Sequence, residues 1–150
     1  MTNYKAARAS LLLAAITPIL GACETLTEMA HPLTGATWRL TDIDTSGSST
    51  RLTPALSERH TIDFEDGGRA VIQLDCNRGN ASWSAASPAG GGTGAITIGP
   101  VASTKMLCPQ PSFGEQLASG LSGAESYTLL LDGRRLLIEA DGMAFTFSAF

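Results

Sequence analysis

The sequence has 150 residues, of which 43% are hydrophobic and 16% charged, so it can bury the core of one small domain and carry a short appendage. Its formal net charge is −4. A protein that binds nucleic acid needs a basic surface to displace counterions from phosphates, so this acidic composition argues against a nucleic-acid partner.

The first 23 residues have the pattern of a bacterial secretory signal. Lys5 and Arg8 are the only charged residues before an apolar stretch at 11–20, and Gly21 and Ala22 supply the small residues of a cleavage site. The stretch is shorter than the roughly 20 residues that a transmembrane helix needs. Residues 20–23 (LGAC) resemble the lipobox of bacterial lipoproteins, in which the cysteine takes a diacylglycerol and the chain is cut before it.

That resemblance implies a signal peptide at 1–22, a lipid on Cys23 and a lipidated tether at 23–32. The alternative is an ordinary secreted protein with a cysteine at this place. Several acyl chains on one residue anchor a protein durably, because each buried CH₂ contributes about 0.8 kcal/mol. We therefore expect a membrane-anchored protein of the cell envelope that faces the periplasm. Glu24 stands where the inner-membrane retention signal of enterobacteria has Asp, which favours the outer membrane.

Removal of the signal leaves eight basic and fourteen acidic residues, a net charge near −6. It also leaves Cys76 and Cys108 as a pair in an oxidising compartment, so we expect a disulfide between them. The loop that it would close spans 33 residues, counting both ends. For a loop of this length the chain-entropy model predicts that the disulfide stabilises the folded state by about 3.5 kcal/mol. Neither cysteine lies in a CxxC motif and no histidines cluster nearby, so we expect neither a metal nor a cofactor.

From residue 33 onward the sequence alternates between short apolar patterns and turn signals. Apolar and polar residues alternate as in half-buried strands, and Asp66 with two glycines after it is typical of a hairpin turn. Ser112 and Glu115 fit a capping box at the start of a helix whose apolar face carries Phe113, Leu117 and Leu121. The segments 46–57 and 87–94 are interpreted as loops. Strands are expected at 38–43, 60–65, 69–75, 81–86, 95–98, 126–131, 135–140 and 143–150.

Eight strands with short connections and one helix predict a β-rich α+β domain. The expected architecture is a curled antiparallel sheet of about eight strands, resembling an open barrel, with the single helix covering its apolar face. Trp38 and Trp83 are expected in the core.

Three motifs in order resemble META domains, the family that includes HslJ-like heat-inducible lipoproteins. Residues 33–40 (LTGATWRL) resemble its opening LxGTxWxL strand, 76–78 (CNR) its GCN element, and 103–109 (STKMLCP) its TxMACP element. The resemblance covers 33–150, nearly the whole expected mature chain. Two departures stand out, since Asp75 replaces the usual Gly and Leu107 the usual Ala. The change to Asp75 bears on whether the backbone before Cys76 keeps the family's geometry.

The resemblance implies a β-rich domain that is located in the cell envelope. It also implies a link to envelope stress and antibiotic tolerance, but it implies no chemical reaction. The residues agree, because a hydrolase needs a nucleophile beside a base, and His60 is the only histidine outside the tether. We interpret His60 as a solvent-facing strand residue. Asp63, Glu65 and Asp66 are interpreted as an acidic edge beside a turn, because a glycosidase needs two carboxyl groups at a set separation in a cleft.

A candidate surface patch consists of Asn77, Arg78, Lys105 and Met106, which a bond between Cys76 and Cys108 would bring together. The alternative, which we favour, is that Asn77 and Thr104 only satisfy backbone groups around the bridge.

We therefore expect a monomeric, non-catalytic envelope lipoprotein that binds a protein partner or acts during stress. A carrier or sensor of an apolar ligand held inside the sheet is the second hypothesis. A cavity beneath the helix would favour the carrier, and full interdigitation there would favour a surface role. The inner-face side chains that decide between them are Leu40, Ile62, Phe64, Ile72, Phe145 and Phe147.

Overall fold

The computed structural model describes residues 30–130 and 133–150, which form ten strands and two helices. The expected signal peptide, the lipid attachment point Cys23 and most of the expected tether lie outside the described residues. In chain order the elements are β1 (Thr37–Thr45), β2 (Ser48–Arg51), α1 (Pro54–Ser57), β3 (His60–Glu65), β4 (Arg69–Leu74), β5 (Asn77–Ala85), β6 (Thr93–Ile98), β7 (Ala102–Ser103), α2 (Gly114–Leu121), β8 (Ala124–Leu130), β9 (Arg135–Ala140) and β10 (Met143–Ala149).

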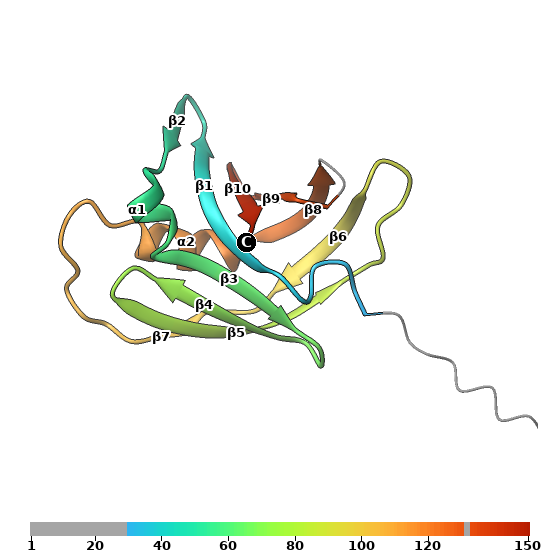
Figure 1. Ribbon diagram of the computed structural model, residues 1–150, viewed down its shortest axis with the longest axis horizontal. Coiled ribbons are helices and arrows are strands. Elements are labelled where there is room, and N and C mark those ends of the chain that lie inside the picture. The colour runs from blue at the N-terminus through green and yellow to red at the C-terminus, as the bar shows by residue number, and fades with distance from the viewer. Residues whose placement is uncertain (1–29, 131–132) are drawn as a thin grey trace, which may run out of the picture.

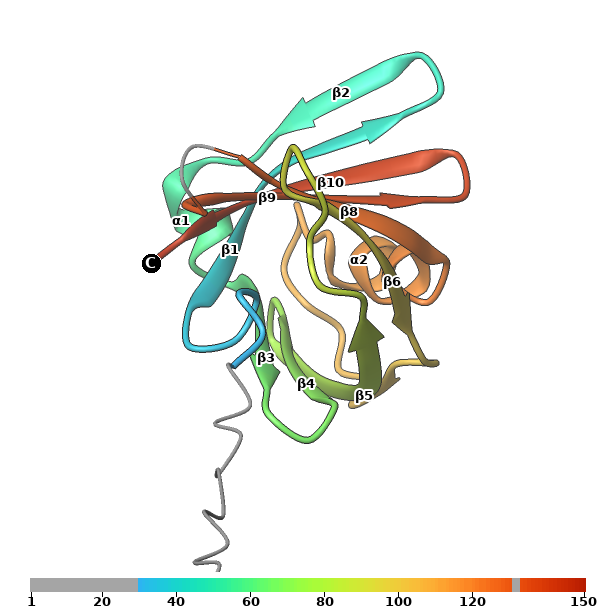
Figure 2. The ribbon, with the colours of Figure 1, turned by 90° about the vertical axis from the view of Figure 1, so that its right-hand side faces the viewer.

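Eight of the strands form a closed antiparallel barrel (Figures 1 and 2). They follow the order β10-β9-β8-β6-β5-β4-β3-β1, and β1 closes the circle by pairing with β10, with Trp38 opposite Ala149 and Ile43 opposite Phe145. β2 pairs with the C-terminal part of β1, at residues 42–45, and β7 pairs with β5. The expected curled sheet of about eight strands is confirmed, and it closes completely.

The barrel strands follow the alternation of the sequence. In β3 and β4 every second side chain points inward and is buried, and the β3–β4 hairpin turns through Gly67 and Gly68 at φ of 88° and 82°. Glycine adopts such positive φ values without steric cost. Trp38 and Trp83 both lie in the core, as expected.

Helix α2 lies across one end of the barrel, between the β8–β10 side and the β4–β6 side (Figure 2). Leu117 and Leu121 are fully buried. A Cβ atom on Gly120 would stand 2.3 Å from Cζ of Phe145, so helix and barrel are in close contact. The expected helix is confirmed, but its capping box is wrong: Phe113 occupies the N-cap, and the structure has no side-chain hydrogen bond there.

The segment 46–57, interpreted as a polar loop, contains β2 and the one-turn helix α1. β2 forms because β1 continues to Thr45 and offers its free edge to a polar hairpin partner. α1 begins after Thr53, whose hydroxyl accepts from the amide of Leu56, with Pro54 in the first turn. Both elements are short and mostly polar, so the hydrophobic periodicity of the sequence does not predict them.

The inner face of the barrel is filled. The six side chains that decide between a carrier and a surface role are each at most 3% exposed and belong to one packed cluster. A cavity large enough for water would leave accessible surface on its walls. Beneath α2 these side chains therefore interdigitate with one another and with the helix.

Candidate functional site

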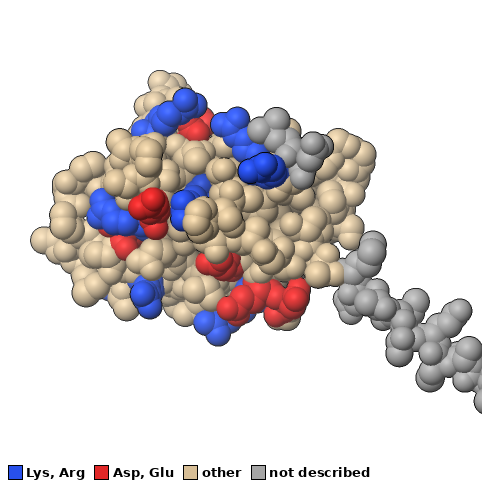
Figure 3. Space-filling model, viewed as in Figure 1, with Lys and Arg blue, Asp and Glu red and all other residues tan. Residues whose placement is uncertain are grey.

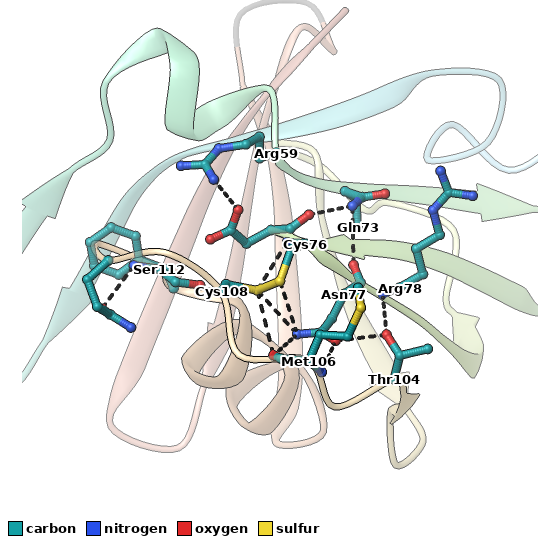
Figure 4. The surroundings of a disulfide bond; sticks show 12 residues. Arg59, Gln73, Cys76, Asn77, Arg78, Thr104, Met106, Cys108 and Ser112 are labelled. Atoms are coloured by element: carbon teal, nitrogen blue, oxygen red, sulfur yellow. Dashed lines mark hydrogen bonds and ion pairs between the residues drawn. A yellow bond between two sulfur atoms is a disulfide. The ribbon is translucent and has the colours of Figure 1, made fainter.

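A disulfide joins Cys76, which follows β4, to Cys108 in the connection between β7 and α2 (Figure 4). The two Cα atoms are 5.6 Å apart. The amide of Cys76 donates to Sγ of Cys108 at 3.2 Å. The structure thus contains the bridge expected from the cysteine count, and it ties the loop before α2 to the barrel wall.

The residue before the bridge has a left-handed backbone. Asp75 has a φ of 62°, a region in which Gly is comfortable and Asp is tolerated better than most residues. Its carboxylate is buried and pairs with Arg59 through Oδ1, while Oδ2 has no hydrogen-bond partner within the described chain. Gln73 donates to the carbonyl oxygen of Asp75 at 2.5 Å. The backbone therefore has the glycine-like conformation, and Arg59 compensates the added charge.

Asn77 fixes the loop of residues 104–108, which we call the Cys108 loop (Figure 4). Its Nδ2 donates to the carbonyl of Met106 at 2.9 Å. Its Oδ1 accepts from the amide of Met106 at 2.7 Å and from the hydroxyl of Thr104 at 2.8 Å. The amide of Arg78 donates in turn to the Thr104 hydroxyl at 3.1 Å. Asn77 and Thr104 thus satisfy backbone groups around the bridge.

The fixed loop presents apolar side chains to solvent. Met106 is 60% exposed and Leu107 is 96% exposed. Arg78 and Lys105 are exposed as well, and Arg78 meets the loop through its backbone. Of the four residues of the candidate patch, the structure brings Asn77 and Met106 into direct contact. The candidate patch did not include Leu107, although this residue replaces the usual Ala of the family, and that difference could have pointed to it.

A hollow of about 320 Å³ separates the Cys108 loop from α2. Met106 and Leu107 line it on one side, and Glu115 and Ala118 line it on the other. The loop and the helix together form a concave surface beside the exposed side chains of Met106 and Leu107.

The expectation that His60 faces solvent is wrong, because its side chain is fully buried. Nδ1 lies 2.7 Å from the carbonyl oxygen of Leu56, and Nε2 accepts from the amide of Phe113 at 3.2 Å. This pair of contacts requires a neutral ring with the proton on Nδ1. Burial lowers the pKa of His60, and the hydrogen bond to Leu56 and the charge of Asp75 oppose that shift only in part. His60 holds α1, β3 and the start of α2 together.

His31 falls in the expected tether, yet it packs on the barrel. Its ring lies 5.5 Å from that of Trp83 and 5.7 Å from that of Tyr127, both edge-on. Its Nε2 is 3.2 Å from the carbonyl oxygen of Ala86 and 3.3 Å from the hydroxyl of Tyr127. The chain is therefore already held against the barrel at residue 31.

Two carboxylates of the expected acidic edge bind neighbouring side chains. Asp63 accepts from the hydroxyl of Thr37 at 2.5 Å, and Glu65 pairs with Arg69 at 3.6 Å. Within residues 30–130 and 133–150, no three His, Cys, Asp or Glu side chains come together as metal ligands would. In the same part of the chain, neither helix has the length and hydropathy of a membrane span.

The family model of the META domain matches residues 31–149. The chain belongs to the META domain family. In this META domain two of the motifs that suggested the family, 76–78 and 103–109, meet at the disulfide and build the Cys108 loop. The match begins at His31, whose ring packs against Trp83 on the barrel.

No curated protein matches this META domain protein. Among solved structures it is similar to the NMR structure of a protein from Burkholderia xenovorans, with 17% identity over 95% of this chain and 97% of that one, at a TM-score of 0.60. It is also similar to a DUF4847 family protein from Bacteroides vulgatus, with 14% identity over 77% and 93% of the two chains, at a TM-score of 0.51. At these identities the similarity shows the fold alone.

Proposed function

We propose that this META domain protein is a non-catalytic lipoprotein of the bacterial envelope that binds a protein partner through the Cys108 loop, and that it acts during envelope stress. The observation that carries the partner-binding proposal is the exposure of Met106 and Leu107 on a loop that is fixed from both sides. The lipid anchor on Cys23 and the periplasmic, outer-membrane location rest on the sequence at 20–24.

Rigidity makes this loop suited to binding. The disulfide and three hydrogen bonds of Asn77 hold the backbone of the loop before any partner arrives. Binding costs less conformational entropy when the binding segment is ordered beforehand. Burial of an exposed leucine side chain contributes about 1.5–3 kcal/mol, so Leu107 is the expected centre of the contact.

The surroundings of the loop also resemble an interface. Lys105 and Glu115 border the apolar pair with opposite charges, as in the polar rim of a protein interface. The hollow between loop and helix offers room for a side chain of the partner.

The other functions have less support. An apolar ligand has no room beside the six inner side chains, since these are packed against one another and against α2. His60 uses both ring nitrogens for backbone hydrogen bonds and has none free for a substrate. A surface role is therefore favoured over a carrier or an enzyme.

Site-specific photo-crosslinking in cells tests the partner-binding role. A Leu107→benzoylphenylalanine variant should yield a discrete crosslinked protein that mass spectrometry identifies. The same replacement at Leu130, an exposed leucine on β8, should not yield it. Combination with Asn77→Ala should weaken the Leu107 product, because the loop then loses the three hydrogen bonds of Asn77 and keeps only the disulfide and the contacts of Thr104 with Arg78. Identical products at both positions, or none at Leu107, would refute the proposal.

Labelling with radioactive palmitate tests the anchor. The wild-type protein should become labelled and fractionate with the outer membrane, and Cys23→Ser should be neither labelled nor membrane-bound. An unlabelled wild-type protein would remove the anchor from the proposal and leave the crosslinking result to stand by itself.

A further inference from the structure

Half of the basic residues from Arg39 onward, four of eight, line one hollow on the outer surface of the barrel. Arg39 comes from β1, Arg51 from β2, Arg135 from β9, and Arg134 directly precedes β9. The hollow has a volume of about 810 Å³. Figure 3 shows Arg side chains around β1 and β2 and near the start of β9.

Asp42 orients two of these arginines. Its carboxylate accepts from Nε of Arg51 at 2.8 Å and lies 4.0 Å from a terminal nitrogen of Arg135. Burial of Asp42 would raise its pKa, but the hydrogen bond from Arg51 and the charges of Arg51 and Arg135 outweigh that effect and lower the pKa. Asp42 therefore stays charged and links its own strand β1 to Arg51 on β2 and Arg135 on β9.

The arginines retain donors for a ligand. Arg51 uses only Nε toward Asp42 and is 79% exposed, so its two terminal amino groups face solvent. Arg39 is oriented by the ring of Phe150, whose centroid lies 3.3 Å from the guanidinium carbon. An arginine held by a neighbour in this way loses little further freedom when it binds an anion.

Charge and size together define the ligand. Four arginines face two acids in the hollow, Asp42 and Glu58, which leaves a local charge of about +2 on a protein of net charge −4. The planar guanidinium matches phosphate oxygens in a two-pronged geometry. The volume lies within the range of roughly 300–1,000 Å³ typical of small-molecule sites, more than an inorganic ion needs. Leu52 and Pro54 supply apolar wall for the rest of such a molecule.

We propose that this hollow binds the phosphate group of an organic phosphate, either a soluble small molecule or a lipid headgroup. The site is separate from the Cys108 loop and does not depend on the function proposed for that loop. Asp42 positions the arginines, and the phosphate takes the donors that Asp42 leaves free.

Isothermal titration calorimetry of the full chain in non-ionic detergent tests the proposal. The probes are glycerol 3-phosphate and dihexanoyl phosphatidic acid, and the controls are glycerol and dihexanoyl phosphatidylcholine. A phosphate probe should bind with a Kd below about 1 mM that weakens as salt is added, while both controls fail to bind. Tighter binding of dihexanoyl phosphatidic acid identifies a lipid headgroup, and equal or tighter binding of glycerol 3-phosphate identifies a soluble ligand.

Substitutions tie the binding to the hollow. Arg51→Gln and Arg135→Gln should each raise the Kd about tenfold, the loss expected for one charge-assisted hydrogen bond. Arg69→Gln is the matched control, because Arg69 is also an exposed strand arginine paired with one carboxylate but lies outside the hollow. It should change the Kd less than twofold. Failure of both phosphate probes to bind, or an Arg69→Gln effect as large as that of Arg51→Gln, would overturn the proposal.

Discussion

Replacement of Arg59 by alanine should destabilise the domain far more than replacement of its partner Asp75 by glycine. Arg59→Ala leaves a carboxylate that is fully buried, with neither oxygen bound to a side chain. Removal of one member of a buried ion pair costs about 3–5 kcal/mol. We expect about 3 kcal/mol, at the lower end of that range, because the Arg59 side chain is 43% exposed and water can follow into its place.

Asp75→Gly removes the buried charge together with its need for a partner. Glycine also adopts the φ of 62° freely, which offsets the lost contacts, so we expect a change of about 1 kcal/mol or less. In that background Arg59 is a partly exposed side chain without a buried partner. A further Arg59→Ala change should then cost little, which gives a coupling energy of about 2 kcal/mol between the two residues.

Urea unfolding of the oxidised protein at pH 7 measures all four members of this cycle. The midpoint should fall markedly for Arg59→Ala and only slightly for Asp75→Gly and the double variant, with an unchanged m-value. Strictly additive losses in the double variant would show that Arg59 does not compensate the Asp75 carboxylate. Equal losses for the two single variants would contradict the larger cost expected for Arg59→Ala.

Three further changes have defined outcomes. Reduction of the disulfide should lower the free energy of unfolding by about 3.5 kcal/mol, measured by urea unfolding with and without reductant; a loss below about 1 kcal/mol would contradict the entropic estimate. His60 has a lowered pKa in the folded state, so below about pH 6.5 the unfolded chain takes up a proton that the folded chain does not, and stability falls; the stability difference between wild type and His60→Gln should therefore shrink from pH 7 to pH 5, and a constant difference would exclude this role. Gly120→Ala gains about 1 kcal/mol of helix propensity but places Cβ 2.3 Å from the ring of Phe145, an overpacking that costs about 1–3 kcal/mol; the melting temperature should fall, whereas Gly123→Ala, with its nearest contact at 3.5 Å, should leave it nearly unchanged.

The β3–β4 part of the barrel could be predicted from the sequence because these two strands alternate strictly. Ile62, Phe64 and Ile72 recur at every second position, and glycines mark the turns between their strands. The short elements between Ser48 and Ser57 could not be predicted in this way. They are polar, and they form through pairing with the end of β1 and through a hydroxyl cap.

His60 shows a different kind of error. It shares its face with Ile62 and Phe64, so the alternation itself points inward, but the general preference of histidine for the surface was given more weight. The two backbone partners that make its burial possible come from residues 4 positions before it and 53 positions after it. The partner at residue 113 becomes adjacent only in the folded chain.

The candidate sites were predictable in unequal measure. Cys76 and Cys108 could be paired by counting, and Asp75 and Leu107 were visible as departures from a family pattern. The arginine-lined hollow had no local signal, because Arg39 and Arg135 are almost a hundred residues apart. They become neighbours only when the barrel closes.

The pairing of β1 with β10 joins the two ends of the domain, with Thr37 accepting a hydrogen bond from the amide of Phe150. The barrel therefore closes only when β10 is in place, because β10 is the strand that pairs with β1. Contacts between residues so distant in sequence form slowly, so a growing chain stays open until β10 has been synthesised. A chain stopped at residue 142 leaves β1 and β9 as two bare edges, and it should be digested by protease under conditions in which the whole protein survives.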